Sequence, residues 1–134
     1  MNAAMTLLIG RILIASVFLV AGARQLMYFA GSVGYFGKLG FPVPEATAWL
    51  SVAIHVVCGL MLVAGWKTRV ASWLLVVLVV IATAMAHRFW LADAAQYGNQ
   101  LNHFLKNLAI IGGLLYVIAF GAGAMSVDGR KGGG

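Results

Sequence analysis

The sequence predicts an all-α, polytopic membrane protein: residues 1–134 form a single domain, a four-helix transmembrane bundle with both termini on the cytoplasmic side. Composition is the first observation behind this prediction. Hydrophobic residues make up 63% of the chain and charged residues only 9%, and the mean hydropathy of +0.97 is well above that of soluble domains. The second observation is that the chain divides into four apolar runs, each near the roughly 20 residues that cross a hydrocarbon core about 30 Å thick.

The four expected helices cover residues 5–28, 46–66, 69–91 and 101–122. The first is expected to be a retained anchor rather than a signal peptide, because no Lys or Arg precedes it and Arg11 interrupts it. The connections are short, so little chain remains for an aqueous domain. Any chemistry is therefore expected inside the bundle, at its ends, or in a partner.

Basic residues near the helix ends are divided almost evenly between the two membrane surfaces. One surface carries Arg11, Lys67, Arg69, Arg130 and Lys131, and the other carries Arg24, Lys38, Arg88 and Lys106. Three residues of the second set stand beside other polar groups at helix ends, which indicates that they belong to a site rather than mark the cytoplasmic surface. The first set lies on the same surface as the termini, and because cytoplasmic loops are enriched in Lys and Arg, it favours cytoplasmic termini. The net charge of +6 then fits anionic lipid head groups. No basic tract interleaved with aromatic residues suggests nucleic-acid binding.

The first connection, residues 28–45, is rich in glycine and aromatic residues and holds both prolines, Pro42 and Pro44. Glycine and proline interrupt helices, and Tyr and Phe favour the head-group level of a bilayer. The connection is expected to fold back over the outer end of the bundle. Two interpretations remain open, a lid over a pocket and an interfacial anchor.

Polar side chains from three helices converge on the outer membrane surface. The third expected helix ends in TAMAHRFW, the fourth begins with LNHFLKNLA, and the first ends in ARQ. Ionisable groups at membrane depth are costly and are functional candidates by default. The candidates are Arg24, Gln25, His87, Arg88, Trp90, His103, Lys106 and Asn107. Their convergence predicts a basic, aromatic-lined pocket among the helix ends.

The second helix carries a polar stripe of Thr47, Ser51 and His55, four residues apart. His55 would lie roughly 14 Å below the outer end, at 1.5 Å per residue, and would form the floor of the pocket. A buried histidine can also simply bond a neighbouring serine or carbonyl. Likewise, Arg88 and Lys106 can be interpreted as side chains that extend to the interface.

Metal and redox chemistry within the chain have weak support. Cys58 is the only cysteine, so a disulfide or dithiol centre within one subunit is excluded. His87 and His103 could face a haem, but no acidic residue shares their helices to orient an imidazole. We therefore expect no metal or haem. A basic pocket with aromatic walls instead suits an anionic or carbonyl-bearing ligand, such as a quinone head group.

The order of motifs resembles the DoxX family of small four-helix bacterial membrane proteins. The motifs are GRILIA, AGARQL, YFGKLGFPVPE, CGLMLVAGWKTR, AHRFW and FLKNLAIIGG, which together span about residues 10–128. The resemblance implies a multi-pass protein of the bacterial cytoplasmic (inner) membrane with a link to redox metabolism, because the family is named after a subunit of a thiosulfate:quinone oxidoreductase.

By position in these motifs, the resemblance implies that the functional residues are Arg24, His87, Trp90, Lys106 and Asn107. The chain departs from the family pattern at two other positions. His55 stands where an acidic residue is frequent, and Arg88 stands where proline is common. The first departure removes a carboxylate partner for the arginine that closes the first helix and makes the pocket more basic.

The functional hypothesis is a quinone-linked oxidoreductase subunit in which His87 and His103 are catalytic and the other candidates, His55 included, bind the ligand. Electrons would come from a second substrate or a redox protein partner. The alternative is a non-catalytic scaffold for redox or oxidative-stress partners. A small-molecule carrier has little support because no inverted repeat is evident, and a haem protein is the remaining alternative. A homo-oligomer is compatible with the sequence, and residues 129–134 receive no role.

Overall fold

The computed structural model describes residues 2–132, which form helices and their connections. The helices are α1 (Ala3–Met27), α2 (Phe29–Lys38), α3 (Pro44–Ala64), α4 (Thr68–Ala86), a short 3₁₀ turn η1 (Phe89–Leu91), α5 (Ala94–Phe120) and α6 (Val127–Lys131). Helices α1, α3 and α5, and α4 extended through η1, are long and apolar enough to cross a membrane. The predicted all-α bundle of four spanning helices is therefore confirmed.

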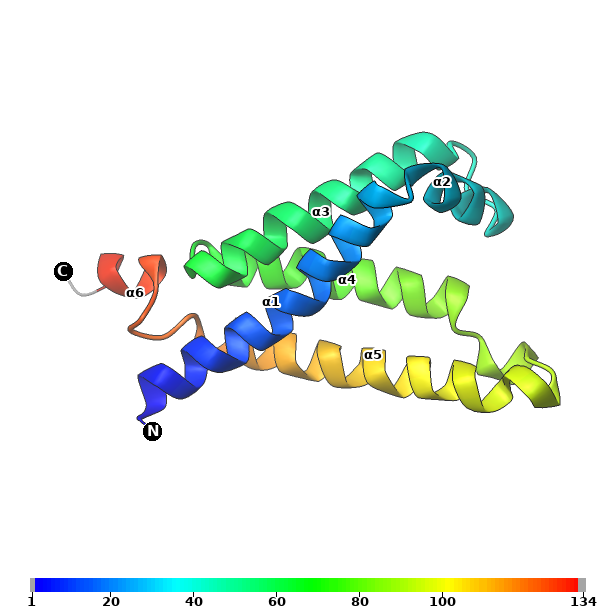
Figure 1. The fold of residues 1–134 in the computed structure, drawn as a ribbon. Helices are drawn as coiled ribbons and strands as arrows, with labels where there is room; N and C mark the ends of the chain where they lie inside the picture. Colours follow the sequence, from blue (N-terminus) through cyan, green and yellow to red (C-terminus); the bar gives the residue numbers. More distant parts are fainter. Residues whose placement is uncertain (1, 133–134) are drawn as a thin grey trace.

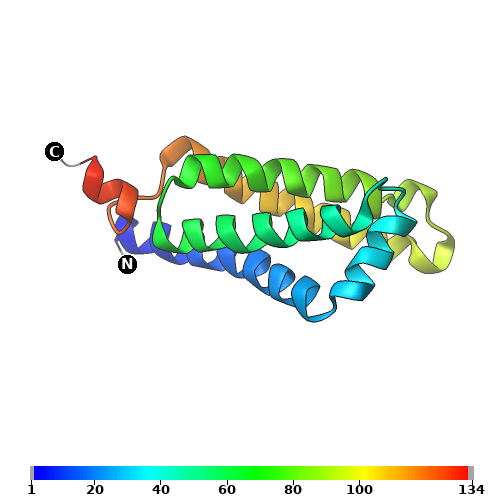
Figure 2. The ribbon, with the colours of Figure 1, turned by 90° about the horizontal axis from the view of Figure 1, so that it is seen from above.

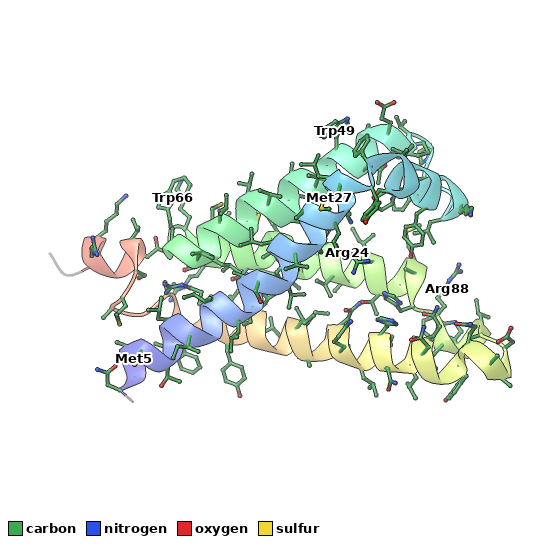
Figure 3. All side chains as sticks on the ribbon, viewed as in Figure 1. Met5, Arg24, Met27, Trp49, Trp66 and Arg88 are labelled. Atoms are coloured by element: carbon green, nitrogen blue, oxygen red, sulfur yellow. The ribbon has the colours of Figure 1, made fainter. Side chains whose placement is uncertain are left out.

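Both termini lie at one end of the bundle, which we call the terminal end (Figure 1). The opposite end, which holds α2 and the α4–α5 connection, is the distal end, and a perpendicular view shows the same arrangement (Figure 2). Trp66 and Met5 lie near the terminal end, whereas Trp49 and Arg88 lie near the distal end (Figure 3). Four crossings place the two chain ends on one side, as the sequence predicts.

Most helix boundaries lie within two residues of the sequence prediction, and the two that differ by more both lie at the distal end. Helix α4 ends at Ala86 rather than at 91, where His87 leaves the helical conformation and caps it. Helix α5 begins at Ala94 rather than at 101, because the Asp93 side chain caps it by accepting a hydrogen bond from the Gln96 amide at 2.9 Å. An aspartate followed by a polar stretch is a typical start of a helix, and this signal could have indicated the earlier start of α5.

The first connection contains a helix, α2, where its glycines suggested an irregular path. Tyr28, with φ −114° and ψ 46°, interrupts the chain between α1 and α2 and redirects it. Glycine lowers helix propensity by only about 1 kcal/mol per residue, and packing against α3 outweighs this cost. The expectation that this segment folds back over the distal end agrees with the fold (Figure 2).

Helix α3 begins with Pro44 in its first turn and ends at Gly65. Proline suits the start of a helix because its missing N–H would have no partner there. Gly65 adopts φ +71°, a left-handed conformation that terminates the helix and turns the chain toward α4. Ser126 lies directly against this glycine, so the C-terminal segment packs on the α3–α4 turn.

Most of the hydrophobic core lies in the terminal half of the bundle. Its buried residues are Ala15, Phe18, Cys58, Leu62, Ala71, Leu75, Val76, Val79 and Leu114. Helix α1 packs mainly on α3, and α4 packs mainly on α5. The two pairs separate toward the distal end, as α3 and α5 do in Figure 1. The distal half is therefore the part of the bundle where side chains leave space.

A buried arginine fastens the terminal end. Arg11 is 2% exposed, and its guanidinium donates hydrogen bonds to the carbonyl groups of Ala122, Val63 and Met125. Three carbonyl acceptors offset part of the cost of burying this charge. The sequence treated Arg11 as a topology signal, whereas the structure makes it a link between α1, α3 and the chain after α5.

Asp128 fastens the same end from the C-terminal segment. Its carboxylate accepts hydrogen bonds from the backbone amides of Lys67 and Thr68, at 2.8 and 2.9 Å, and from the Thr68 hydroxyl at 2.9 Å. Residues 129–131, to which the sequence assigned no role, complete α6 behind Asp128. Residues 133 and 134 of the same stretch lie outside the described residues.

Candidate functional site

A cavity of about 540 Å³ lies in the distal half of the bundle, between the α1–α3 pair and the α4–α5 pair. Most of its lining is apolar. Its polar lining residues are Gln25, Tyr35, Thr47, Ser51, His55, His87, Lys106 and Asn107. A mostly apolar cavity of this size with a few convergent polar groups is the usual form of a small-molecule site.

The polar stripe of α3 faces the cavity, with His55 deepest in the bundle. The His55 Nδ1 atom is 2.7 Å from the Ser51 carbonyl oxygen and 3.3 Å from its hydroxyl. Because a carbonyl only accepts, Nδ1 carries the hydrogen and Nε2 of a neutral ring is left as an acceptor. His55 therefore makes the hydrogen bond to a neighbouring carbonyl that is expected of a purely structural buried histidine. It also lines the cavity.

At the distal end, His87 and His103 lie against each other. Their ring centroids are 4.9 Å apart with an interplanar angle of 18°. The His87 Nδ1 atom is 3.1 Å from the Gln100 side-chain oxygen, and Lys106 donates to His103 Nδ1 at 3.3 Å. His87 and Lys106 line the cavity. His103 contacts both of them from outside the lining.

Asn107 is held in a hydrogen-bonded chain between α5 and α4. Its side-chain nitrogen donates to the Thr83 hydroxyl at 2.9 Å, and this hydroxyl donates to the Val79 carbonyl at 2.6 Å. Thr83 is buried. The chain fixes the rotamer of Asn107 and leaves its second amide hydrogen and its oxygen for a ligand in the cavity.

Helix α2 and the loop after it cover the distal opening of the cavity. Tyr35 and Phe36 of α2 line the cavity together with Leu39 and Phe41. Partial burial raises the pKa of Tyr35 above its ordinary value, so the phenol keeps its proton at neutral pH and can donate a hydrogen bond. The first connection therefore has the position of a lid.

Gln25 supplies the one cavity-lining side chain with an unsatisfied buried atom among residues 2–132. Its Oε1 atom is buried and has no hydrogen-bond partner there, although the side chain lines the cavity. A buried amide without a partner costs roughly 1–3 kcal/mol. A ligand bearing a hydroxyl or carbonyl group beside Gln25 would remove this cost, depending on which way the amide is oriented.

Four residues predicted to form the site lie elsewhere. Arg24 is exposed in a shallow depression between α1 and α2. Arg88 is exposed, and Trp90, 54% exposed, packs on Phe89 and Phe104 in an aromatic cluster outside the cavity. His103 is the fourth and reaches the cavity only through its neighbours. The aromatic walls of the cavity are Phe18, Tyr35, Phe36 and Phe41 instead.

The described residues show no group of three or more His, Cys, Asp or Glu side chains that could hold a metal ion. The alternative of a haem between His87 and His103 does not fit their geometry. Metal–nitrogen bonds of about 2.0 Å on each side need more room than the 4.9 Å between the ring centroids.

Sequence reasoning missed Gln100 and the α2 side chains. Gln100 stands one residue before the predicted start of the fourth helix, so it was assigned to a loop. Its spacing of three from His103 on an extended α5 was the signal that could have found it. Tyr35 and Phe36 belonged to the connection whose role as lid or anchor was left open.

Comparison with known proteins places the chain in a family. The family model described as DoxX matches residues 6–88. Inner membrane protein YphA of Escherichia coli K12 is 32% identical over 124 residues, which are 92% of this chain and 89% of that protein. Inner membrane protein YqjF of the same organism is 30% identical over 121 residues, 90% of this chain and 88% of that protein.

The chain is also similar to part of a longer eukaryotic protein. ER-derived vesicles protein ERV29 of Saccharomyces cerevisiae is 34% identical over 109 residues, and the match covers 81% of this chain but 35% of that protein. No solved structure matches. The similarity therefore spans about a third of the yeast protein and nearly all of the bacterial ones.

The bacterial relatives are named as inner membrane proteins, and the chain has four helices suited to cross a bilayer. The protein is thus a multi-pass inner membrane protein surrounded by lipid, as the sequence predicts. The family model covers more than half of the chain, and the motifs that carry the resemblance lie on the helices and connections described above. The chain belongs to the DoxX family.

Proposed function

We propose that the protein binds a membrane-soluble quinone by its head group in the distal cavity, as the ligand-binding subunit of a quinone-linked oxidoreductase. The observation that supports this best is the cavity lining: an apolar volume of about 540 Å³ with His87, Lys106 and Asn107 at its distal end and His55 deeper in the bundle. Quinones reside at this membrane depth and offer two carbonyl oxygens on a flat apolar ring.

The hydrogen-bond donors of the cavity suit quinone carbonyls. The Lys106 ammonium has three hydrogens and gives one to His103, and Asn107 has a second amide hydrogen beyond the one given to Thr83. Both can donate to one carbonyl oxygen. Phe18 and Phe36 supply ring faces for the quinone ring.

The cavity also offers two hydrogen-bond acceptors, which suit the hydroxyl groups of the reduced quinol. A neutral His55 accepts through Nε2, because its Nδ1 hydrogen is engaged with Ser51. The buried Gln25 oxygen also lacks a donor among residues 2–132. A quinol hydroxyl donates where a quinone carbonyl accepts, so the cavity has groups for both redox states.

Reduction of a quinone to a quinol takes up two electrons and two protons. In the route we assign to protons, the Lys106 ammonium first gives a proton to the quinone oxygen in the cavity, and the neutral amine is then protonated again by way of His103, its hydrogen-bond partner. His87, with its ring held by Gln100 and stacked on His103, is the second proton-handling group. The electrons come from a redox protein partner or a second substrate.

The experiment is binding of a chain-free quinone, dimethoxy-methyl-benzoquinone, to the purified protein in lipid nanodiscs, measured by equilibrium dialysis. Wild type should bind it, and His87→Ala and Asn107→Leu should each weaken binding about tenfold, the loss expected for one hydrogen bond to a polar ligand. Arg88→Ala is the matched control, because Arg88 is exposed beside His87 but does not line the cavity.

Mass spectrometry of small molecules that co-purify with wild type and with His87→Ala is the companion measurement. A quinone present in the first sample and absent from the second supports the proposal. Absence of quinone from both, together with no binding by dialysis, contradicts it and favours the scaffold. In that case, changes at Lys67, Arg69 or Arg130 rather than in the cavity should disrupt partner proteins.

A further inference from the structure

The distal cavity extends to the lipid-facing surface of the bundle on the side of α3 and α4. Four large apolar side chains line the cavity and still remain about half exposed: Leu50 at 62%, Leu74 at 47%, Val77 at 54% and Ile81 at 46%. We call these four residues the α3–α4 groove. A residue that lines a cavity and is also exposed marks an opening, and at this depth the opening faces hydrocarbon rather than water.

The opposite side of the cavity is less open to lipid. There, Val17 of α1, 45% exposed, is the single large aliphatic residue among residues 2–132 that combines exposure with a place in the lining. The α3–α4 groove is therefore the wider apolar route into the cavity.

On α4, the groove residues lie closer to the terminal end of the bundle than His87 does. Val77 precedes His87 by ten positions, which is roughly 15 Å along a helix at 1.5 Å per residue. The groove residues carry no hydrogen-bonding side chain, whereas the distal end holds His87, Lys106 and Asn107. This division suits a ligand with a polar head and a long apolar chain.

We propose that the α3–α4 groove holds the hydrocarbon chain of the ligand and is the lateral opening through which that ligand enters from the bilayer. This inference rests on the proposed function for the identity of the head group. The occupant is a lipid-phase amphiphile, with its head in the distal cavity and its chain lying between α3 and α4. A chain at this place stays in an apolar medium throughout, so access needs no passage through water.

Two variants of α4 test the groove with a matched control. Val77→Trp fills the groove with a bulky ring, and Val80→Trp adds the same ring to a lipid-facing position that does not line the cavity, since Val80 is 49% exposed. Each variant in nanodiscs is titrated with two probes that share one head: dimethoxy-methyl-benzoquinone and its decyl derivative. Because both variants meet the same lipid, partitioning of the decyl chain into the bilayer cancels in their comparison.

Val77→Trp should weaken binding of the decyl quinone at least tenfold and leave binding of the chain-free quinone unchanged, while Val80→Trp should change neither. Unchanged chain-free binding also shows that Val77→Trp has folded. Three results would each overturn the inference and leave the head-group site standing. They are an equal loss of decyl-quinone affinity in the two variants, no loss of that affinity in Val77→Trp, and an equal loss of affinity for both probes in Val77→Trp. If neither quinone binds wild type, the proposed function fails and the inference falls with it.

Discussion

Single residues at the terminal end show how a charge is stabilised where the helices leave the membrane. Burial acts to raise the pKa of Asp128, but hydrogen bonds from the Thr68 and Lys67 amides and the Thr68 hydroxyl, with the nearby charge of Lys131, hold it below its ordinary value. These bonds require the carboxylate form. Asp128 therefore binds the C-terminal segment to the start of α4 only while it is ionised.

Asp128→Asn should lower the free energy of unfolding by about 1–2 kcal/mol at neutral pH, because an amide nitrogen cannot accept the two hydrogen bonds made by Thr68. The lowered pKa means that the wild-type contribution is complete above about pH 3.9, the ordinary value, and is lost as pH falls through the folded-state pKa. Thermal unfolding in detergent between neutral pH and about pH 3 measures both effects.

Asp93→Asn is the control for this prediction. Asp93 caps α5 with one oxygen that accepts from the Gln96 amide, and asparagine is about as good a cap as aspartate. Its unfolding midpoint should stay near that of wild type. An equal loss of stability in the two variants would show that the removal of any carboxylate has this effect, and that the hydrogen bonds between Asp128 and Thr68 are not its specific cause.

At the scale of helices, two glycines set how closely α1 approaches α3. A Cβ atom on Gly22 would lie 2.9 Å from Val56 and 3.0 Å from the Cβ of His55, and one on Gly59 would lie 2.8 Å from the Leu19 side chain. These distances are shorter than van der Waals contact. The α1–α3 pair is thus a small-residue interface of the kind common between membrane helices, and it positions His55 for the cavity.

Gly22→Ala should destabilise the protein by about 1–3 kcal/mol, because the added methyl group pushes against the Val56 side chain and the Cβ of His55 on α3. Gly112→Ala should be neutral or stabilising by up to about 1 kcal/mol, because its Cβ meets no atom within 4 Å and alanine is the better helix former. Thermal unfolding in one detergent compares the pair. The same direction of change in both variants would contradict the close-packing argument.

At the scale of the whole molecule, the bundle is a wedge with a packed terminal half and a hollow distal half. Most core residues belong to the first part, with Phe18 and Val79 also lining the cavity, while the cavity's polar residues and α2 belong to the second. The two ends therefore differ in structure. Hydrogen bonds of Arg11 and Asp128 hold the helices together at the terminal end, and the distal end contains the cavity. The placement of the terminal end in the cytoplasm stays a prediction from the distribution of basic residues.

Lys38→Cys and Lys131→Cys test the expected orientation. The only native cysteine, Cys58, is buried and gives little background labelling. Both lysines are exposed and lie at opposite ends of the bundle. In intact cells, a membrane-impermeant maleimide should label Lys38→Cys, and Lys131→Cys should react only after permeabilisation. The reverse pattern would place the termini outside the cytoplasm.

The sequence by itself determined the membrane class and the four crossings, and it placed the candidate site residues at one end of the bundle. Four apolar runs of spanning length leave a bilayer as the only suitable solvent. Alternating helix directions then place His87 and Lys106 at one surface, whatever the packing. His55 could likewise be placed deeper on α3 from its spacing, since an α-helix has a fixed rise per residue.

Only the tertiary structure decided which candidates share a cavity. The rotation of each helix about its axis depends on contacts such as Gly22 against His55, and spacing along one helix does not report it. The turn at His87 leaves Arg88 and Trp90 outside the cavity, although they follow it in sequence. The roles of α2, Arg11 and Asp128 also required the fold, because their partners lie far away in the chain and long-range contacts leave no local pattern.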